Sequence, residues 1–141
     1  MIWKTDWEAA DNYAANGASD LARLNSNYQA LAQRYRDVFG ATIAVVSLGT
    51  LSYASIPFAE MLNTIEENCE ELRVWHFLPW VGARKTWTYG QRAPDYADIN
   101  RWETNGQTVE ITQTRSMTYM VYCGVGVCGR SWQRQNNFRR Q

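Results

Sequence analysis

The sequence contains 141 residues, of which 14 are basic and 14 acidic, so its formal net charge is zero. This length fits one domain of ordinary size and excludes two large independent domains, while the balanced charge excludes attraction to nucleic acid or membrane by a field of the whole protein. The odd number of cysteines, three, argues against a secreted disulfide framework. No apolar stretch forms a secretory leader or reaches the ~18 residues of a membrane helix, so we expect a protein made in the cytoplasm, without membrane contact.

The spacing of apolar residues predicts a first helix over residues 18–39. Ser19 is a candidate N-cap, and Gly40 is a candidate end. The apolar residues alternate in steps of three and four, as in the buried seam of a coiled coil. The seam consists of Leu21, Leu24, Tyr28, Leu31, Tyr35 and Val38.

A second helix is predicted over residues 56–74, with Ser55 and Pro57 suited to its start and Pro79 beyond its end. Its seam keeps the same phase through Phe58, Leu62, Ile65, Cys69 and Leu72. Glutamates crowd this helix, and their spacing favours a solvated acidic face over an acid/base pair or a metal site. They are Glu60, Glu66, Glu67, Glu70 and Glu71.

A third helix is predicted over residues 94–112, with Pro94 in its first turn. Its seam reads Ile99, Trp102, Gly106 and Val109. Because Gly106 has no side chain, we expect either another side chain to fill this position or the helix to break there. Residues 108–112 alternate in polarity and equally suit a strand.

Three octapeptides align without gaps, one in each predicted helix, at residues 20–27, 61–68 and 98–105. Their second and fifth positions are apolar, and their eighth is always asparagine. Asparagine is a poor helix former that apolar patterning does not require, so we predict a structural role in which each amide bonds an adjacent backbone or a partner amide. The three residues are Asn27, Asn68 and Asn105. Asn63 is predicted to matter less for stability than Asn68.

An extended stretch with an aromatic residue precedes each helix, at residues 5–7, 50–53 and 86–89. The repeating unit is therefore a strand-like arm, a polar turn and an amphipathic helix. The units cover about residues 3–39, 48–74 and 85–112. We predict a mainly α fold in which residues 1–112 form a helical repeat domain.

Residues 113–141 are predicted to form a separate C-terminal region. Residues 117–128 are rich in β-branched and aromatic residues with central glycines, which predicts a short β hairpin or arm. The tail, residues 130–141, combines arginines with Trp132 and Phe138 and suits either single-stranded nucleic acid or a protein partner. We favour a protein partner, because no known nucleic-acid module accompanies the tail and the second helix offers an acidic face. A frayed terminus is the remaining alternative.

The sequence offers little for catalysis or metal binding. The single histidine, His76, lies in an apolar stretch and is interpreted as a structural residue. The sequence contains no signature that combines a nucleophile with a base and an oxyanion site. The glycines near Cys123 and Cys128 are not followed by the Gly-Lys-Ser/Thr that ends a phosphate-binding loop. These cysteines with Cys69 and His76 only nominally complete a zinc site. We expect no enzyme, no cofactor and no metal.

Three motifs carry a resemblance to a known group of proteins: KTDW at residues 4–7, SDLARLNSN at 19–27 and YADINRWETN at 96–105. They resemble small structural proteins of tailed bacteriophages and prophages of Gram-positive bacteria, which carry recurrent Asp-Leu/Ile/Phe-Asn-Arg-Ile/Trp-Glu-x-Asn helices. The resemblance covers roughly residues 3–110 and implies a virion component of the tail, baseplate or fibre region without enzymatic activity. The second unit departs from the pattern at Met61 and Thr64, where Asp and Arg are expected.

The sequence thus leads us to expect a structural adaptor or organiser of a phage tail that contacts other virion proteins, in several copies or as a homo-oligomer. The alternative is a small nucleic-acid-binding protein that uses the C-terminal tail. The predicted interface residues are Trp3, Trp7, Trp87, Tyr89, Arg130, Trp132, Arg134, Phe138, Arg139 and Arg140.

Overall fold

The computed structural model is mainly helical, as the periodicity predicts. It describes residues 1–10, 13–49, 59–90 and 94–123, and it describes no side chains within 13–19 and 119–123. Three helices make up most of this part: α1 (Tyr13–Phe39), α2 (Ala59–Trp75) and α3 (Tyr96–Cys123). The described ranges contain no β-strand.

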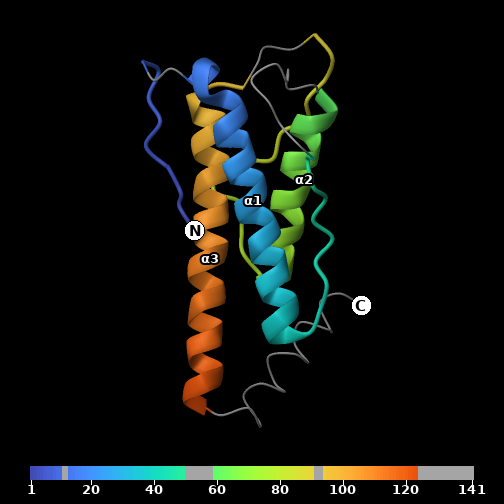
Figure 1. The fold of residues 1–141 in the computed structure, drawn as a ribbon, viewed down its shortest axis with the longest axis vertical. Helices are drawn as coiled ribbons and strands as arrows, with labels where there is room; N and C mark the ends of the chain where they lie inside the picture. Colours follow the sequence, from blue (N-terminus) through green and yellow to red (C-terminus); the bar gives the residue numbers. More distant parts are fainter. Residues whose placement is uncertain (11–12, 50–58, 91–93, 124–141) are drawn as a thin grey trace.

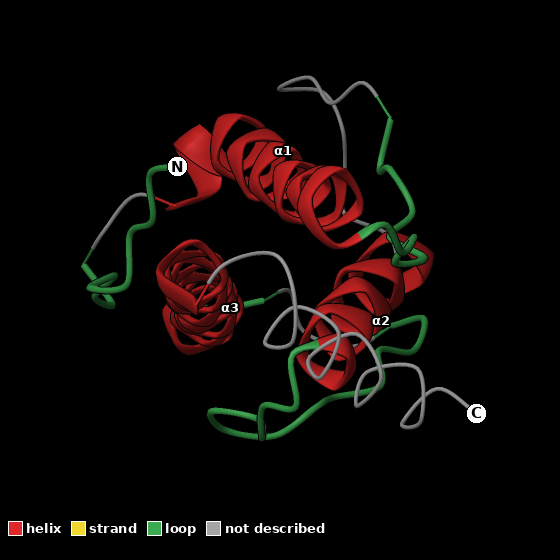
Figure 2. Cartoon of the chain, turned by 90° about the horizontal axis from the view of Figure 1, so that it is seen from below, coloured by secondary structure: helices red, strands yellow, loops and turns green. Residues whose placement is uncertain are grey.

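All three helices run in the same direction (Figure 1). The chain must therefore return along the bundle between consecutive helices. A 17-residue helix such as α2 is about 25 Å long, a distance that roughly eight extended residues cover. The extended segments, residues 1–7 (arm 1), 41–49 (arm 2) and 79–89 (arm 3), lie on the outside of the bundle (Figure 2).

The core lies along the common axis of the bundle, where equivalent positions of the three octapeptides meet. The predicted seams are buried there except for Val38, which is half-buried, and Phe58, which lies outside the described residues. Trp102 is completely buried, and the Tyr28 hydroxyl donates to its carbonyl oxygen at 2.8 Å. Equivalent positions of the three units that are buried are Leu21, Leu62 and Ile99; Leu24, Ile65 and Trp102; Tyr28, Cys69 and Gly106; Leu31, Leu72 and Val109.

Gly106 does not break α3, because side chains from elsewhere fill its position. A Cβ atom built on Gly106 would collide with the indole of Trp3 and lie 2.9 Å from Cε1 of Tyr28. The rings of Trp3 and Tyr28 are themselves in contact, with centroids 6.3 Å apart. Glycine is thus the residue that lets arm 1 insert a tryptophan between α1 and α3.

The helix boundaries differ from the prediction in ways that local chemistry explains. α1 begins at Tyr13, so Ser19 lies inside the helix and its prediction as the N-cap is wrong. Its first turns contain several alanines, which favour helix. Gly40 does end this helix, with φ at +78° and its N–H bonded to the Arg36 carbonyl at 2.9 Å.

The start of α3 is fixed by two aspartates rather than by Pro94, which precedes the helix. Asp95 and Asp98 each accept a hydrogen bond from the backbone N–H of the other, both at 3.1 Å. This reciprocal arrangement is a capping box. The predicted start signals of the second helix, Ser55 and Pro57, lie outside the described residues.

α3 extends through Cys123, so residues 106–114 are helical and the predicted β element does not begin at 117. The rest of that predicted element, residues 124–128, lies outside the described residues. The hydroxyl groups of Thr108, Ser116 and Thr118 each donate to the carbonyl four residues earlier, so these polar side chains bond within the helix. α3 also crosses the predicted boundary between residues 112 and 113, and the division into two regions stays a prediction.

Candidate functional site

Amide side chains of the helices hold the backbone of all three arms. Asn68 accepts from the Val46 N–H at 2.9 Å and donates to the Val46 carbonyl at 2.7 Å. Asn105 makes the same pair of bonds with Val81, each at 3.0 Å. Asn27 donates to the carbonyl of Ile2 at 2.7 Å, so the invariant eighth position of the octapeptide bonds the adjacent backbone, as predicted.

A second set of asparagines, at the third position of the octapeptide, was missed by the sequence analysis. Asn100 exchanges two hydrogen bonds with the backbone of Trp7, both at 2.8 Å. Asn63 does the same with Trp87, at 2.7 and 2.8 Å. The aligned octapeptides do contain this pattern, but only in part: the third position is asparagine in the second and third units and Ala22 in the first.

Together with Asn25 of α1, which accepts from the Leu48 N–H at 3.0 Å, the two sets bond each arm to two neighbouring helices. Arm 1 is bonded to α1 and α3, arm 2 to α2 and α1, and arm 3 to α3 and α2. Seen along the bundle, the three described arms lie around the three helices, one beside each pair of neighbouring helices (Figure 2). The chain therefore has an internal pseudo-threefold arrangement, in which each arm joins its own helix to a neighbouring one.

Ion pairs cross two of the three helix–helix contacts at equivalent positions. Arg101 of α3 binds both carboxylate oxygens of Glu66 of α2, and both side chains are buried. Arg23 of α1 binds Glu103 of α3 in the same way. Burial alone would lower the pKa of Arg101, but hydrogen bonding and charge from Glu66 outweigh it, so the pKa is raised.

Glu66 corrects the prediction that the glutamates of the second helix form a solvated face. Its side chain is fully buried, and it accepts from Arg101 and from the Trp87 indole N–H at 3.2 Å. Of the other glutamates, Glu60 and Glu67 are exposed. The outer-face interpretation therefore holds for these two but not for Glu66.

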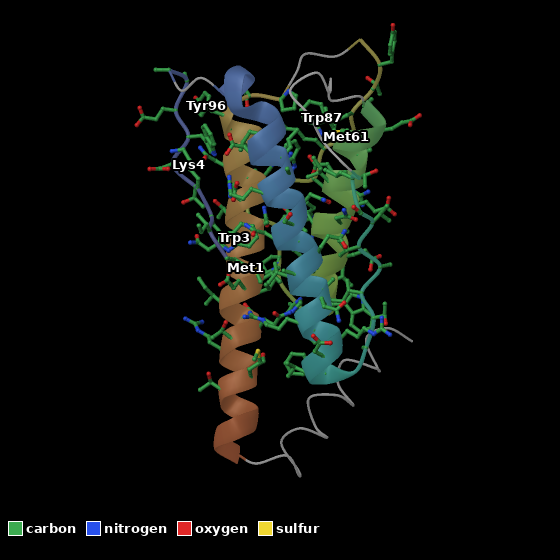
Figure 3. The ribbon with its side chains drawn as sticks, in the orientation of Figure 1. Met1, Trp3, Lys4, Met61, Trp87 and Tyr96 are labelled. Atoms are coloured by element: carbon green, nitrogen blue, oxygen red, sulfur yellow. The ribbon has the colours of Figure 1, made fainter. Side chains whose placement is uncertain are left out.

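The predicted interface residues fall into three groups. Trp7 and Trp87 are each only 7% exposed and contact the chain's own helices, with Lys4 and Lys85 beside their rings, so they belong to this chain's core. Trp3 is half-buried on arm 1 beside α3 (Figure 3), whereas Tyr89 is fully exposed. The remaining predicted residues, Arg130, Trp132, Arg134, Phe138, Arg139 and Arg140, lie outside the described residues.

A chain of polar side chains crosses the bundle near the C-terminal end of α2 and includes the single histidine. Arg34 donates to the Gln113 amide oxygen, and the Gln113 amide nitrogen lies 3.3 Å from Nε2 of His76. Nδ1 of His76 lies 2.6 Å from the Leu72 carbonyl oxygen, to which it donates as an N–H. Burial, together with the charge of Arg34, lowers the pKa of His76 to about 4.

The buried Cys69 thiol is likewise unsuited to nucleophilic chemistry. Burial raises its pKa to about 12, so the thiol stays protonated at neutral pH. In the part of the chain that the structure describes, no three His, Cys, Asp or Glu side chains lie close enough to hold a metal ion. Within the same ranges, no helix has the length and apolar character needed to cross a membrane.

Comparison with known proteins adds no assignment: no protein-family model, curated protein or solved structure matches this chain. The arrangement of arms and helices is therefore the basis on which function can be argued.

Proposed function

We propose that the protein is a non-enzymatic structural component of a phage virion, an adaptor or organiser in the tail, baseplate or fibre region. The observation that carries the proposal is how the third unit, whose motif resembles those of such proteins, acts in the structure. In the third unit, Asn100 and Asn105 hold two different arms, while Arg101 and Glu103 join α3 to the other two helices. These polar side chains build a scaffold of fixed shape from a short repeated unit.

The scaffold also leaves apolar and aromatic side chains on its outside, which supports contact with other virion proteins. Tyr89, at the end of arm 3, is fully exposed, and tyrosine is enriched in protein interfaces. Branched apolar residues at the positions held by the eighth-position asparagines are also exposed: Ile2, Val46 and Val81 are 74%, 60% and 45% accessible. The scaffold is therefore proposed to present its arms to partners, in several copies per particle, after synthesis in the host cytoplasm.

The test is to purify phage particles from the strain that carries the gene and to identify their proteins by mass spectrometry. The protein is expected at several copies per particle, and particles from a strain with an early stop codon in the gene should lack a tail feature in electron micrographs. Absence of the protein from washed particles, together with normal particles from the stop-codon strain, would contradict the proposal. A variant lacking residues 130–141 is expected to fold but not to enter particles.

The alternative function, binding of single-stranded nucleic acid by the tail, rests on its arginines and aromatic rings. It predicts binding of single-stranded DNA that weakens steeply with salt and disappears in the variant lacking residues 130–141. A salt-insensitive or undetectable interaction argues for the protein partner instead.

A further inference from the structure

The groove between α1 and α3 holds arm 1 mainly through the arm's backbone. Asn100 bonds the N–H and carbonyl of Trp7, and Glu103 accepts from the Lys4 N–H at 3.3 Å. Asn27 and Arg23 both donate to the carbonyl of Ile2, at 2.7 and 2.9 Å. Contacts of this kind recognise an extended chain whatever its side chains, as in proteins that bind peptides by their backbone.

Two side chains of arm 1 add selectivity. Trp3 enters the space at Gly106 and donates its indole N–H to Glu110, and Trp7 is buried against the helices. The neighbouring Ile2, Thr5 and Asp6 are exposed. The groove therefore selects an extended segment with tryptophans four residues apart and tolerates variation between them.

The connection between arm 1 and α1 is exposed along its described part. Glu8, Ala9 and Ala10 all lie on the surface, in contrast to Trp7 immediately before them. Arm 1 is thus a well-seated element that joins the bundle through an exposed connector. Exchange of such an element between identical chains keeps every contact within the groove, so it requires little free energy beyond that of association.

From these observations we infer that the α1–α3 groove is a peptide-recognition site that also takes arm 1 from a second copy of this chain. The inference rests on the proposed function, since a multi-copy assembly brings copies together at high local concentration. The chain's own arm competes for the groove at an effective concentration of roughly the millimolar range, so exchange between copies becomes favourable where the protein is concentrated.

The first experiment uses the full chain and a fluorescent peptide of residues 1–10, with binding measured by fluorescence anisotropy. The peptide is expected to bind saturably to the wild-type chain and at least tenfold more tightly to a Trp3→Ala chain, whose own arm is weakened. A Trp3→Ala peptide is expected to bind at least tenfold more weakly, whereas an Ile2→Ala peptide, altered at an exposed side chain, binds as the original does. If the Trp3→Ala chain does not fold, the three peptides are compared on the wild-type chain.

The second experiment measures dimers by native mass spectrometry after incubation at concentrations from ~10 μM to ~1 mM. Dimers are expected to increase with concentration for the wild type and the Ile2→Ala chain, and a large excess of the residue 1–10 peptide, which competes with the arm for the groove, should reduce them at least tenfold. A lack of saturable peptide binding, or equal binding of the Trp3→Ala peptide, would overturn the recognition site. If the chain binds the peptide but stays monomeric at all concentrations, the groove does not take arm 1 from a second copy. The presence of the protein in purified particles tests the proposed function separately, so the two failures are distinguishable.

Discussion

Arg101 of α3 and Glu66 of α2 form a two-pronged ion pair inside the bundle, with only 8% and 1% of their side chains exposed. The same positions of the repeat form a second ion pair, between Arg23 of α1 and Glu103 of α3. At the third helix–helix contact, these positions are occupied by Thr64 and Asn25. Thr64 in the second unit and Asn25 in the first both depart from the repeat, and the third possible ion pair is therefore absent.

Glu66→Gln is expected to lower the free energy of unfolding by about 3 kcal/mol, because the buried Arg101 guanidinium loses its bidentate counter-charge and retains the more distant Asp98, at 3.7 Å. Glu67→Gln on the exposed face of the same helix is the matched control and should change stability by less than about 0.5 kcal/mol. Urea unfolding followed by circular dichroism measures both. Equal free energies of unfolding for the two variants would show that the Arg101–Glu66 pair does not stabilise the fold.

Asn68→Ala and Asn105→Ala are each expected to destabilise the protein by about 1–3 kcal/mol, because each removes the bonds that a helix makes to both polar groups of an arm residue. Asn63→Ala should have an effect of similar size, since Asn63 holds Trp87 in the same way. This replaces the prediction from sequence that Asn63 matters less. The exposed Gln107 provides the control substitution, Gln107→Ala, and melting temperatures that group Asn63 with Gln107 contradict the expectation.

Gly106→Ala is expected to destabilise the protein although alanine favours helix by about 1 kcal/mol. The added methyl group collides with Trp3 and lies close to Tyr28. In a Trp3→Ala background the same substitution should cost less, because one of the two obstructing rings is absent. A double-mutant cycle by chemical unfolding measures this coupling, and additive effects would show that Trp3 does not occupy the position.

The depressed pKa of His76 predicts that stability falls as the pH falls. An unfolded histidine takes up a proton near pH 6.5, whereas His76 in the folded protein does so near pH 4. Between these values unfolding binds a proton, so the histidine's contribution, about 3 kcal/mol at most, is present above pH 6.5 and is lost as the pH falls through 4.

Replacement of His76 by glutamine isolates this contribution, since the opposing effect of Glu103, whose pKa is raised by burial, is common to both proteins. The free energy of unfolding of the wild type should decrease more steeply than that of His76→Gln between pH 6.5 and 4. Parallel pH profiles for the two proteins would contradict the assignment.

A third ion pair should be possible where the repeat lacks one. Asn25 accepts from the Leu48 N–H, as Glu103 accepts from the Lys4 N–H, so Asn25→Glu retains an acceptor for arm 2. Combined with Thr64→Arg, the substitution is expected to give a favourable coupling of about 1 kcal/mol or more relative to the single variants. A coupling near zero would argue against the equivalence of the three helix–helix contacts.

Periodicity alone identified the helical class and the buried seams, because each seam is a local pattern along one helix. The eighth-position asparagines were found because all three units retain them. Asn63 and Asn100 were missed, and Glu66 was misplaced on the surface, because their partners lie on other units of the chain. The predicted strand at residue 117 gave too much weight to local β-propensity, because α3 continues through Cys123.

The position of arm 1 has a consequence for how the protein acquires its fold. Trp7 bonds Asn100, and Trp3 bonds Glu110, so the residues of arm 1 are held by residues made about a hundred positions later. While the chain is being synthesised, α1 and α2 emerge before the groove for arm 1 exists. Contacts so distant in sequence slow folding, and the tryptophans of arm 1 stay unburied until α3 docks. The docking of arm 1 between α1 and α3 is therefore expected to be the last step in forming the bundle.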